Sequence, residues 1–311
     1  SDDRNTVCFD DAGLPSVMVR VPVSGMQRQF VWVGKYLCSL CEGGACSLPL
    51  RRPIHGVDFD MALHLCRQKG NGWTLTPFAL RMQIAQACRA AGFLPDGNND
   101  RGHDYFHPDQ KGTPTGTGTV LCGSGPVEWA HDGTPCGLWD MNGNLNEWDA
   151  GFRLMEGEIQ LIPMEQQLQP QADMSADSPL WRAMNEHGEL VAPGSKDTLK
   201  YDAMGKGVRL TRRVEHPGVG NSAFAAIQEQ ENLLVPSLAV ALGLYPEATR
   251  HGYGHGWRWI STQGECLPLC GGAYRAIDHA GVFFAGITHP RTMDYELIGF
   301  RTVFTGEEDE G

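Results

Sequence analysis

The C-terminal stretch Leu267–Phe304 combines a regular frame with side chains that share no common character. The frame consists of Gly271-Gly272, the AGVF run at 280–283 and the IGFR run at 298–301. Between these pieces, Tyr, Arg, Ile, Asp, His, Thr, Met and Glu follow one another with neither a helical nor a strand period. A core segment would show a period, and a disordered segment would lack the Gly and aromatic frame. The pattern predicts a scaffold that presents interchangeable side chains, as a binding surface does.

Composition and charge narrow the classes of protein to which the chain can belong. A length of 311 residues suffices to bury a substantial core, and 39 Gly with 19 Pro predict more turns than helix. A net charge of −12 argues against nucleic-acid binding, because phosphate neutralisation needs clustered Lys and Arg. No apolar run approaches the roughly 20 residues of a membrane span. The N-terminal SDDRNTVCFDD is too polar for a signal peptide.

Strands and a long loop are predicted on either side of a helical region. Alternating apolar and polar residues from Val17 to Leu37 predict two or three strands with a turn at Ser24-Gly25. The Gly-, Asn-, Asp- and Thr-rich residues 95–125 predict a long loop that Tyr105 and Phe106 pack. A phosphate-binding loop is excluded here, because the GxxxxGK[ST] spacing and a preceding strand are missing.

Two helices are predicted between these regions. Asp58 is placed to cap a first helix, which Gly70 ends. Thr76 followed by Pro77 predicts the start of a second helix, which Gly92 ends. The residues that share an apolar face are Phe59, Ala62, Leu63 and Cys66 in the first helix, and Leu80, Ile84, Cys88 and Ala91 in the second.

The rest of the chain predicts mainly short strands and loops. Strands are expected at 151–154 and 158–162, an insertion at 163–177, and one or two helices within 222–244. The summed pattern is α+β: two helices beside a twisted antiparallel sheet, with much irregular structure.

Ten cysteines raise the question of a metal site or disulfides. The spacings match no known zinc module, and the compartment stays open. Cys66 and Cys88 fall on apolar helix faces, which favours buried thiols. The residues that would form a tetrahedral zinc site, as the alternative, are Cys38, Cys41, Cys266 and Cys270.

Three segments together resemble the formylglycine-generating-enzyme type of C-type lectin fold. Residues 51–92 resemble its helix, Gly-Trp, helix unit. HDGTPCGLWDMNGNLNEW (131–148) is close to its Gly-Leu-x-Asp-x-x-Gly-Asn-x-x-Glu-Trp signature, and Cys270-Gly271-Gly272 with Ile298–Arg301 resembles its C-terminal end. The resemblance spans Val17 to Phe304 apart from insertions, and it implies this fold for the chain.

Two functions occur on that fold. The oxidase that generates formylglycine carries two reactive cysteines after the Gly-Gly pair, near the positions of Ala276 and Gly281, but no Cys follows Cys270 here. Related iron-dependent sulfoxide synthases use a His triad on an added helical domain, which this sequence lacks. Because these features are missing, an oxidase of this type, or a degenerate homologue of one, is the less favoured of the two functions.

The variable proteins of diversity-generating retroelements resemble the chain more closely, in GNGWTLTPFAL, HPDQKGTPTGTGTVLCGSGP and AGVFFAG…IGFR. In that family, adenine-directed mutagenesis rewrites Asn codons in the C-terminal segment. Met293 and Glu296 are not reachable from AAC or AAT by changing adenines, so they need other codons or are constant. The residues that are reachable include Tyr274, Arg275, Ile277, Asp278, His279, Thr288, His289 and Tyr295.

The resemblance implies a ligand-binding protein rather than an enzyme. Tyr274, Arg275 and Tyr295 are the expected anchors, and Trp257 and Trp259 flank the site unless Trp259 packs in the core. Metal or acid–base roles for the histidines, and paired-acid chemistry for the carboxylates, are less favoured. The predicted ligand-binding residues are Ala273, Tyr274, Arg275, Ile277, Asp278, His279, Thr288, His289, Met293, Asp294, Tyr295 and Glu296.

A structural calcium is also implied, since the matching stretch of the oxidase branch holds one. The oxygens would come from Asp140, Gly143, Leu145 and Glu147; alternatively, Glu147 bonds the Asn142–Asn144 turn. Catalytic residues and a required cofactor are not expected. The residues expected to be structural are Phe283, Phe284, Phe300 and Arg301.

The expected organisation is one C-type lectin-like domain over 1–311, with insertions within 155–250 and a variable segment at 257–304. The expected partner is a protein or glycan on a target cell surface, with no nucleic acid and no membrane span. The expected setting is a phage virion tail or a bacterial cell surface. The sequence shows no signal of an oligomeric state.

Overall fold

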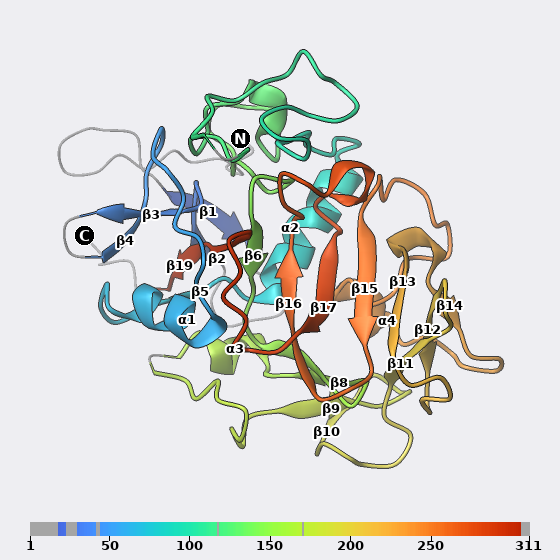
Figure 1. Cartoon of the computed structure of the whole chain (residues 1–311). Helices are drawn as coiled ribbons and strands as arrows, with labels where there is room; N and C mark the ends of the chain where they lie inside the picture. Colours follow the sequence, from blue (N-terminus) through green and yellow to red (C-terminus); the bar gives the residue numbers. More distant parts are fainter. Residues whose placement is uncertain (1–17, 23–29, 42–43, 117, 170, 306–311) are drawn as a thin grey trace.

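The computed structural model describes residues 18–22, 30–41, 44–116, 118–169 and 171–305. Over these residues the fold is α+β, strands dominate, and the helices are few and short (Figure 1). None of the helices in these ranges is long and apolar enough to cross a membrane. The α-helices are α1 (Phe59–Arg67), α2 (Phe78–Ala90), α3 (Met164–Gln167) and α4 (Ser237–Ala241). Single 3-10 turns occur at Val127–Trp129, Phe224–Ala226 and Ile277–His279.

The strands of the described residues fall into three sheets. A small sheet has the order β1-β2-β19-β5, and β3 pairs with β4 in a separate hairpin. These strands are β1 (Met18–Pro22), β2 (Phe30–Gly34), β3 (Cys38–Cys41), β4 (Gly44–Ser47), β5 (Trp73–Leu75) and β19 (Thr302–Phe304). The large sheet contains β6 (Asn146–Trp148), β7 (Phe152–Met155), β8 (Glu158–Leu161), β9 (Arg182–Met184), β10 (Leu190–Val191), β11 (Lys200–Ala203), β12 (Val208–Thr211), β13 (Val219–Ala223), β14 (Gln228–Glu229), β15 (Trp257–Ser261), β16 (Glu265–Cys270), β17 (Ala285–His289) and β18 (Ile298–Phe300).

The large sheet is mixed, so the prediction of an antiparallel sheet is wrong in part. Its central order is β13-β15-β17-β16-β7-β8-β11-β12-β14. Most neighbours are antiparallel, but β15 with β17, β6 with β18 and β12 with β14 are parallel. The chain runs along β15, turns back through β16, and then inserts β17 between them. Because β17 is antiparallel to β16, it must be parallel to β15.

The region 155–250, predicted to hold insertions, contributes strands to both edges of the large sheet. Strands β8, β11, β12 and β14 continue it beyond β7, and β13 pairs with β15 at the other edge. In Figure 1, β16, β17 and β15 lie side by side at the centre, and α2 lies behind them. No α-helix of the described residues lies in front of these three strands in Figure 1.

The first predicted helix is confirmed with its cap. Helix α1 begins at Phe59, and the Asp58 carboxylate accepts a hydrogen bond from the Met61 N–H at 2.7 Å. The chain leaves the helix before Gly70, whose φ of 121° suits glycine. The four residues predicted to face the core are all buried: Phe59, Ala62, Leu63 and Cys66.

The second predicted helix is confirmed, but its start is made differently. Helix α2 begins after Pro77, and no side chain caps it. The Thr76 hydroxyl donates instead to the Arg301 carbonyl at 2.9 Å, so it ties the helix start to the C-terminal strands. On the predicted apolar face, Leu80, Ile84 and Cys88 are buried, whereas Ala91 is exposed at the helix end.

Three other expectations had different outcomes. The turn at Ser24-Gly25 lies outside the described residues. Within 222–244 only Ser237–Ala241 is α-helical, because the chain first completes β13 and then makes a 3-10 turn. The 95–125 loop is present over its described residues, but Tyr105 and Phe106 are 44% and 43% exposed and do not fill its interior. The buried Asp104 carboxylate holds it instead, accepting from four neighbouring donors.

The four cysteines of the alternative zinc site do not form a metal-binding group in the part of the chain that the structure describes. The described cysteines are all free thiols. The clusters of described side chains that could hold a metal ion contain no cysteine. Cys270 lies beside Asp149 and Arg81, whereas Cys38 lies near Cys66 and Lys69. The prediction that Cys66 and Cys88 are buried thiols is confirmed.

A buried group of charges joins α2, the large sheet and the small sheet. Glu147 in β6 is fully buried and accepts from the Arg301 guanidinium at 3.0 and 3.2 Å. Arg81 of α2 lies 2.8 Å from Glu147 and 2.5 Å from Asp149. Arg301 also donates to the Gly34 carbonyl at 2.7 Å and to the Trp139 carbonyl at 2.6 Å. The predicted structural role of Arg301 is confirmed.

Replacing Arg301 by Lys should lower the free energy of unfolding by about 3 kcal/mol, because breaking a buried ion pair leaves uncompensated groups inside. A single ammonium cannot serve a bidentate carboxylate and two carbonyls on separate segments. Urea denaturation measures the change. The matched control is Arg275→Lys in an exposed Arg–Glu pair, for which a change below about 1 kcal/mol is expected. Equal effects at the two sites would contradict this account.

Candidate ligand-binding surface

The first half of the predicted site is a short loop, 273–279, that follows β16. Gly271 and Gly272 start it with φ values of 84° and 83°, which glycine adopts without strain. A Cβ on Gly272 would come within 2.8 Å of the Ala280 Cβ, so the predicted Gly-Gly frame is a steric requirement. Backbone hydrogen bonds then fix this loop to two other segments. The Tyr274 N–H donates to the carbonyl of Asn144, just before β6. In the 95–125 loop, the Arg101 N–H donates to the Tyr274 carbonyl, and the Asn99 carbonyl accepts from the Ile277 N–H.

The structure buries two residues that the sequence placed in the site. Ala273 is 3% exposed and Tyr274 is 2% exposed. The Tyr274 ring lies against Gly118, where a Cβ would come within 2.6 Å of the ring. Both predictions of ligand contact are corrected, because such side chains offer almost no surface. Tyr274 instead packs the loop onto the Gly-rich region.

The neighbouring residues do reach the surface. Arg275, Ile277 and Asp278 are exposed, and His279 is half-buried. These side chains differ widely in polarity and charge although they are close together in the chain. The loop therefore presents a cation, an aliphatic side chain, an acid and an imidazole from one fixed backbone.

The second half of the site is the segment 288–296, which begins with the last two residues of β17. Thr288 and His289 are half-buried and bonded to each other, Oγ1 to Nδ1, at 3.0 Å. Burial lowers the pKa of His289. Met293 packs against the core beneath α1, so it is a partial correction to the prediction of a displayed side chain. The remaining members of the predicted set, all exposed, are Asp294, Tyr295 and Glu296.

Arg291 fixes the backbone of this second half. Its guanidinium bonds Glu265 at 2.8 and 3.0 Å and Asp60 at 2.8 Å, and its carbonyl accepts from the Phe59 N–H. The sequence reasoning missed Arg291. The sequence signal that could have indicated its structural role is a lone Arg directly after Pro290 in an otherwise irregular stretch.

The two halves meet at an ion pair. The Arg275 guanidinium lies 3.3 Å from the Glu296 carboxylate, although 21 residues separate them. The two side chains are 42% and 52% exposed, so the pair contributes little to stability. Its importance is positional, since it shows that both halves open onto one surface.

Two tryptophans of β15 complete this surface. Trp257 and Trp259 alternate with the buried Arg258 and Ile260, so they point to the opposite face of the sheet. Both rings are half-buried, and the His279 ring lies 4.2 Å from Trp257 and 6.1 Å from Trp259. The prediction that the tryptophans flank the site agrees with this position. The display surface consists of Arg275, Ile277, Asp278, His279, Glu296, Trp257 and Trp259.

The aromatic residues predicted to be core divide between two environments. Phe283 and Phe300 are fully buried, which confirms the prediction for them. The Phe283 ring stacks on Phe224 and meets the Tyr253 ring edge to face. Phe284 is only half-buried, because it belongs to the face of β17 and β15 that Trp257 and Trp259 share. The prediction for Phe284 is wrong.

The surroundings of the four residues of the predicted calcium site disfavour a bound cation. The Glu147 carboxylate is held by Arg81 and Arg301, whose guanidinium groups keep its pKa low although burial alone would raise it. A divalent cation there would face two positive charges. Gly143 donates its N–H to Gly271 O, and Leu145 is buried among apolar side chains. The alternative, a bond from Glu147 to the Asn142–Asn144 turn, is not observed among the described contacts either.

Asp140 is the member of that set with a free acceptor. Its Oδ2 accepts from the Gly123 N–H at 2.8 Å, and its Oδ1 has no hydrogen-bond partner among the described residues. Burial raises the pKa of Asp140 to about 6, and the nearby Glu147 adds to this, against the lowering effects of Gly123 and Arg301. Asp140 has a φ of 60°, a conformation that Asn adopts as readily as Asp.

Other acidic groups are committed to protein donors. Asp96, Asp104 and His107 lie together, as do Asp202, Glu215 and His216. The buried Asp104 accepts four hydrogen bonds from its own loop, and Asp202 accepts from Arg209, His216 and two backbone N–H groups. These contacts explain why the acids gather without invoking a metal.

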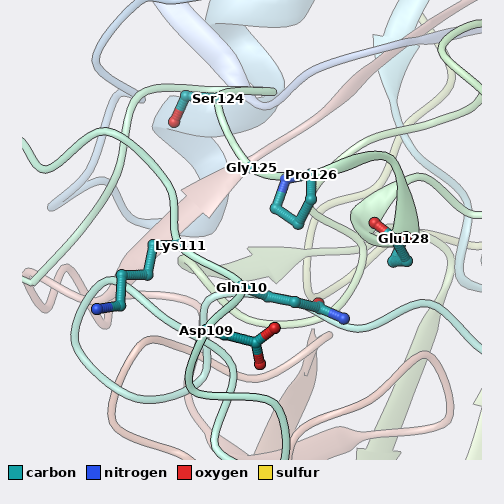
Figure 2. A pocket seen from close by; sticks show the side chains of 7 residues that line it. All are labelled: Asp109, Gln110, Lys111, Ser124, Gly125, Pro126 and Glu128. Carbon is teal, nitrogen blue, oxygen red and sulfur yellow. The ribbon is translucent and has the colours of Figure 1, made fainter.

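Two cavities lie near the Gly-rich loop. Figure 2 shows one of about 540 Å³, lined by side chains of both charges such as Asp109, Lys111 and Glu128, and it contains no residue of the predicted site. A smaller one of about 130 Å³ is lined in part by Phe106, His255 and residues 280–282. The smaller cavity therefore borders the display segment, residues 271–297 between β16 and β18, whereas the larger one does not.

Replacing Asp140 by Asn should raise the free energy of unfolding increasingly between pH 4 and pH 7. The folded-state pKa of about 6 exceeds the ordinary 3.8, so the wild-type stability from this group is present below pH 3.8 and lost as the pH rises through 6. Two pKa units correspond to about 3 kcal/mol. Chemical denaturation at several pH values measures it. A difference that stays constant with pH would refute the assignment, and a calcium-dependent gain confined to the wild type would restore a cation site.

Truncation of Tyr274 should destabilise the protein, whereas truncation of the neighbouring Arg275 should have little effect. Tyr274→Ala should lower the free energy of unfolding by about 3 kcal/mol, because it empties a buried ring site. Arg275→Ala should change it by less than about 0.5 kcal/mol, since the side chain is exposed. Urea midpoints of the two variants decide the point. A tolerated Tyr274→Ala would return Tyr274 to the set of displayed residues.

Comparison of the chain with models of protein families, and with curated proteins, finds no match. The function must therefore be argued from the side chains of the display surface and the backbone that carries them. These show a varied set of groups brought together by a mixed α+β fold.

Proposed function

We propose that the chain is a ligand-binding protein on a C-type lectin scaffold of the formylglycine-generating-enzyme type, with a C-terminal segment diversified by a retroelement. The observation that carries the proposal is the Arg275–Glu296 pair. It joins two irregular stretches of chain into one exposed surface. No regular packing demand explains the residue types there, whereas a binding surface does.

The rigidity of the backbone supports this function. Residues 274, 277, 291 and 298 have their backbone groups hydrogen-bonded to other segments. Side chains presented from such a backbone lose little conformational entropy on binding. A change of side chain then alters affinity without altering the fold, which is the property that a diversified receptor requires.

The pattern of exposure agrees with diversification at four of the eight reachable positions named above. Arg275, Ile277, Asp278 and Tyr295 are reachable from Asn codons and are exposed. Glu296, which is not reachable in that way, belongs to the same surface and would be encoded by another codon or kept constant. Tyr274 is reachable but buried, so a substitution there would lower the stability of the fold and would not change a ligand contact directly.

The alternative oxidase activity has less support. Cys270 is fully buried beside Asp149, and burial raises the pKa of its thiol well above the usual value. A protonated and enclosed thiol is a poor nucleophile and a poor copper ligand. No cysteine follows it in the chain. A protein or glycan on a target cell is therefore the proposed partner, and a phage tail or bacterial surface the proposed setting.

Sequencing the DNA that flanks the gene tests the proposal. We expect a near-identical repeat of the 3′ coding region that has adenines where the gene differs, together with a reverse transcriptase gene. The codons that differ should be those of exposed residues such as Arg275, Ile277 and Asp278. An absent repeat would exclude diversification and leave only a fixed binding surface. Oxygen uptake with a sulfatase-type Cys peptide would instead favour the oxidase.

A further inference from the structure

Two cysteines lie on one face of the β3–β4 hairpin. In the antiparallel register, Ser39 is opposite Cys46 and Cys41 is opposite Gly44. Residues that are opposite one another, or two apart on one strand, share a face. Cys41 and Cys46 are therefore diagonal neighbours on the same side of the hairpin. The twist of a two-stranded ribbon shortens one of its diagonals.

The two thiols are in contact along this diagonal. Burial raises the pKa of the Cys41 thiol to about 11, and a hydrogen bond with the Cys46 thiol adds to that rise. Both sulfurs lie over the hairpin's own carbonyls, Cys41 Sγ at 4.0 Å from Ser39 O and Cys46 Sγ at 3.9 Å from Gly44 O. The pair is thus held in one place by the strands that carry it.

Accessibility separates this pair from other cysteines. Cys41 and Cys46 are half-buried, whereas Cys38, Cys66, Cys88, Cys122, Cys266 and Cys270 are buried. Cys38 neighbours Cys41 in sequence, but strand alternation directs it to the opposite face and into the core beside Phe59 and Cys66. A dissolved oxidant can therefore reach Cys41 and Cys46 without unfolding of the core.

We propose that Cys41 and Cys46 are a redox modification site, which an oxidising environment converts into a disulfide across the hairpin. With a small disulfide such as oxidised glutathione, one protein thiolate attacks a sulfur of the reagent and releases a glutathione thiolate. The second protein thiolate then attacks the protein sulfur of the mixed disulfide and releases the other glutathione. Two protein thiols are oxidised and one glutathione disulfide is reduced, so atoms and electrons balance.

The cross-link would brace a chain of hydrogen bonds that runs from the hairpin to Ile298, two residues after Glu296 of the display surface. The hairpin bonds the next segment through Ser39 with Pro53 and through the Ile54 N–H to Cys38 O at 2.7 Å. That segment in turn bonds β18, since the Gly56 N–H donates to Ile298 O at 3.0 Å. Oxidation would restrict the hairpin on which Pro53–Gly56 rests. This consequence does not depend on which ligand the surface takes.

Incubating the full chain with oxidised glutathione tests the site. We expect the wild-type protein to lose two hydrogen atoms in intact-mass measurement and to melt at a higher temperature than the reduced form. Trypsin with a Glu-specific protease separates residues 36–42 from 43–51. The two peptides should remain joined until a reductant is added, and fragmentation should place the bond on Cys41.

Variants sharpen the result. Cys41→Ser and Cys46→Ser should each lose the joined peptide and gain one glutathione on the remaining thiol. Cys136→Ser, a half-buried cysteine elsewhere, is the matched control and should retain the joined peptide. A bond from Cys38 to Cys46, or a wild type that carries glutathione on both thiols without joining them, would overturn the proposal. Two independent single variants keep the test valid if one of them folds poorly.

Discussion

The fold depends on the burial of Glu147 between two guanidinium groups. Glu147 sits in β6, hydrogen-bonded between β16 and β18, while Arg81 comes from α2 and Arg301 from the chain just after β18. One carboxylate therefore joins the helix layer to both sheets. Burying these charges costs free energy, and their mutual pairing offsets that cost. Removing one partner therefore destabilises the fold far more than replacing the whole group by apolar residues would. The display segment begins after β16 and ends at β18, so both of its ends rest on this cluster.

Local signals in the sequence were enough to predict α1 and α2. Asp58 caps α1 because its side chain needs only the N–H three residues away. The partner of Glu147 was beyond such reasoning, since Arg301 lies 154 residues further along the chain. An acid with Asp, Gly and Asn nearby reads equally well as a cation ligand or as half of a buried ion pair. Which cation neutralises it is settled by tertiary structure, and here it is arginine.

The display segment shows the same limit at the level of single residues. Its lack of period predicted exposed, varied side chains, and Arg275, Ile277 and Asp278 are exposed. Tyr274 carried the same signal, and its aromatic ring made it a favoured anchor. Its burial is decided by Gly118, which lies 156 residues earlier in the chain and leaves space for the ring. For Trp259 the sequence left two alternatives open, flanking the site or packing in the core, and its ring is half-buried on the face of β15 that Trp257 shares.

Ile277 shows how strongly the scaffold controls the display loop. Its φ is 48°, a left-handed conformation that a β-branched residue rarely adopts and that costs about 1–2 kcal/mol. The Ile277 N–H bond to Asn99 O at 2.9 Å and the neighbouring bonds of Tyr274 hold the backbone there regardless. The conformation is thus imposed by the surroundings and not chosen by the residue. Asn is among the few residues comfortable in this region. Asn would therefore occupy position 277 with less backbone strain than the Ile that stands there.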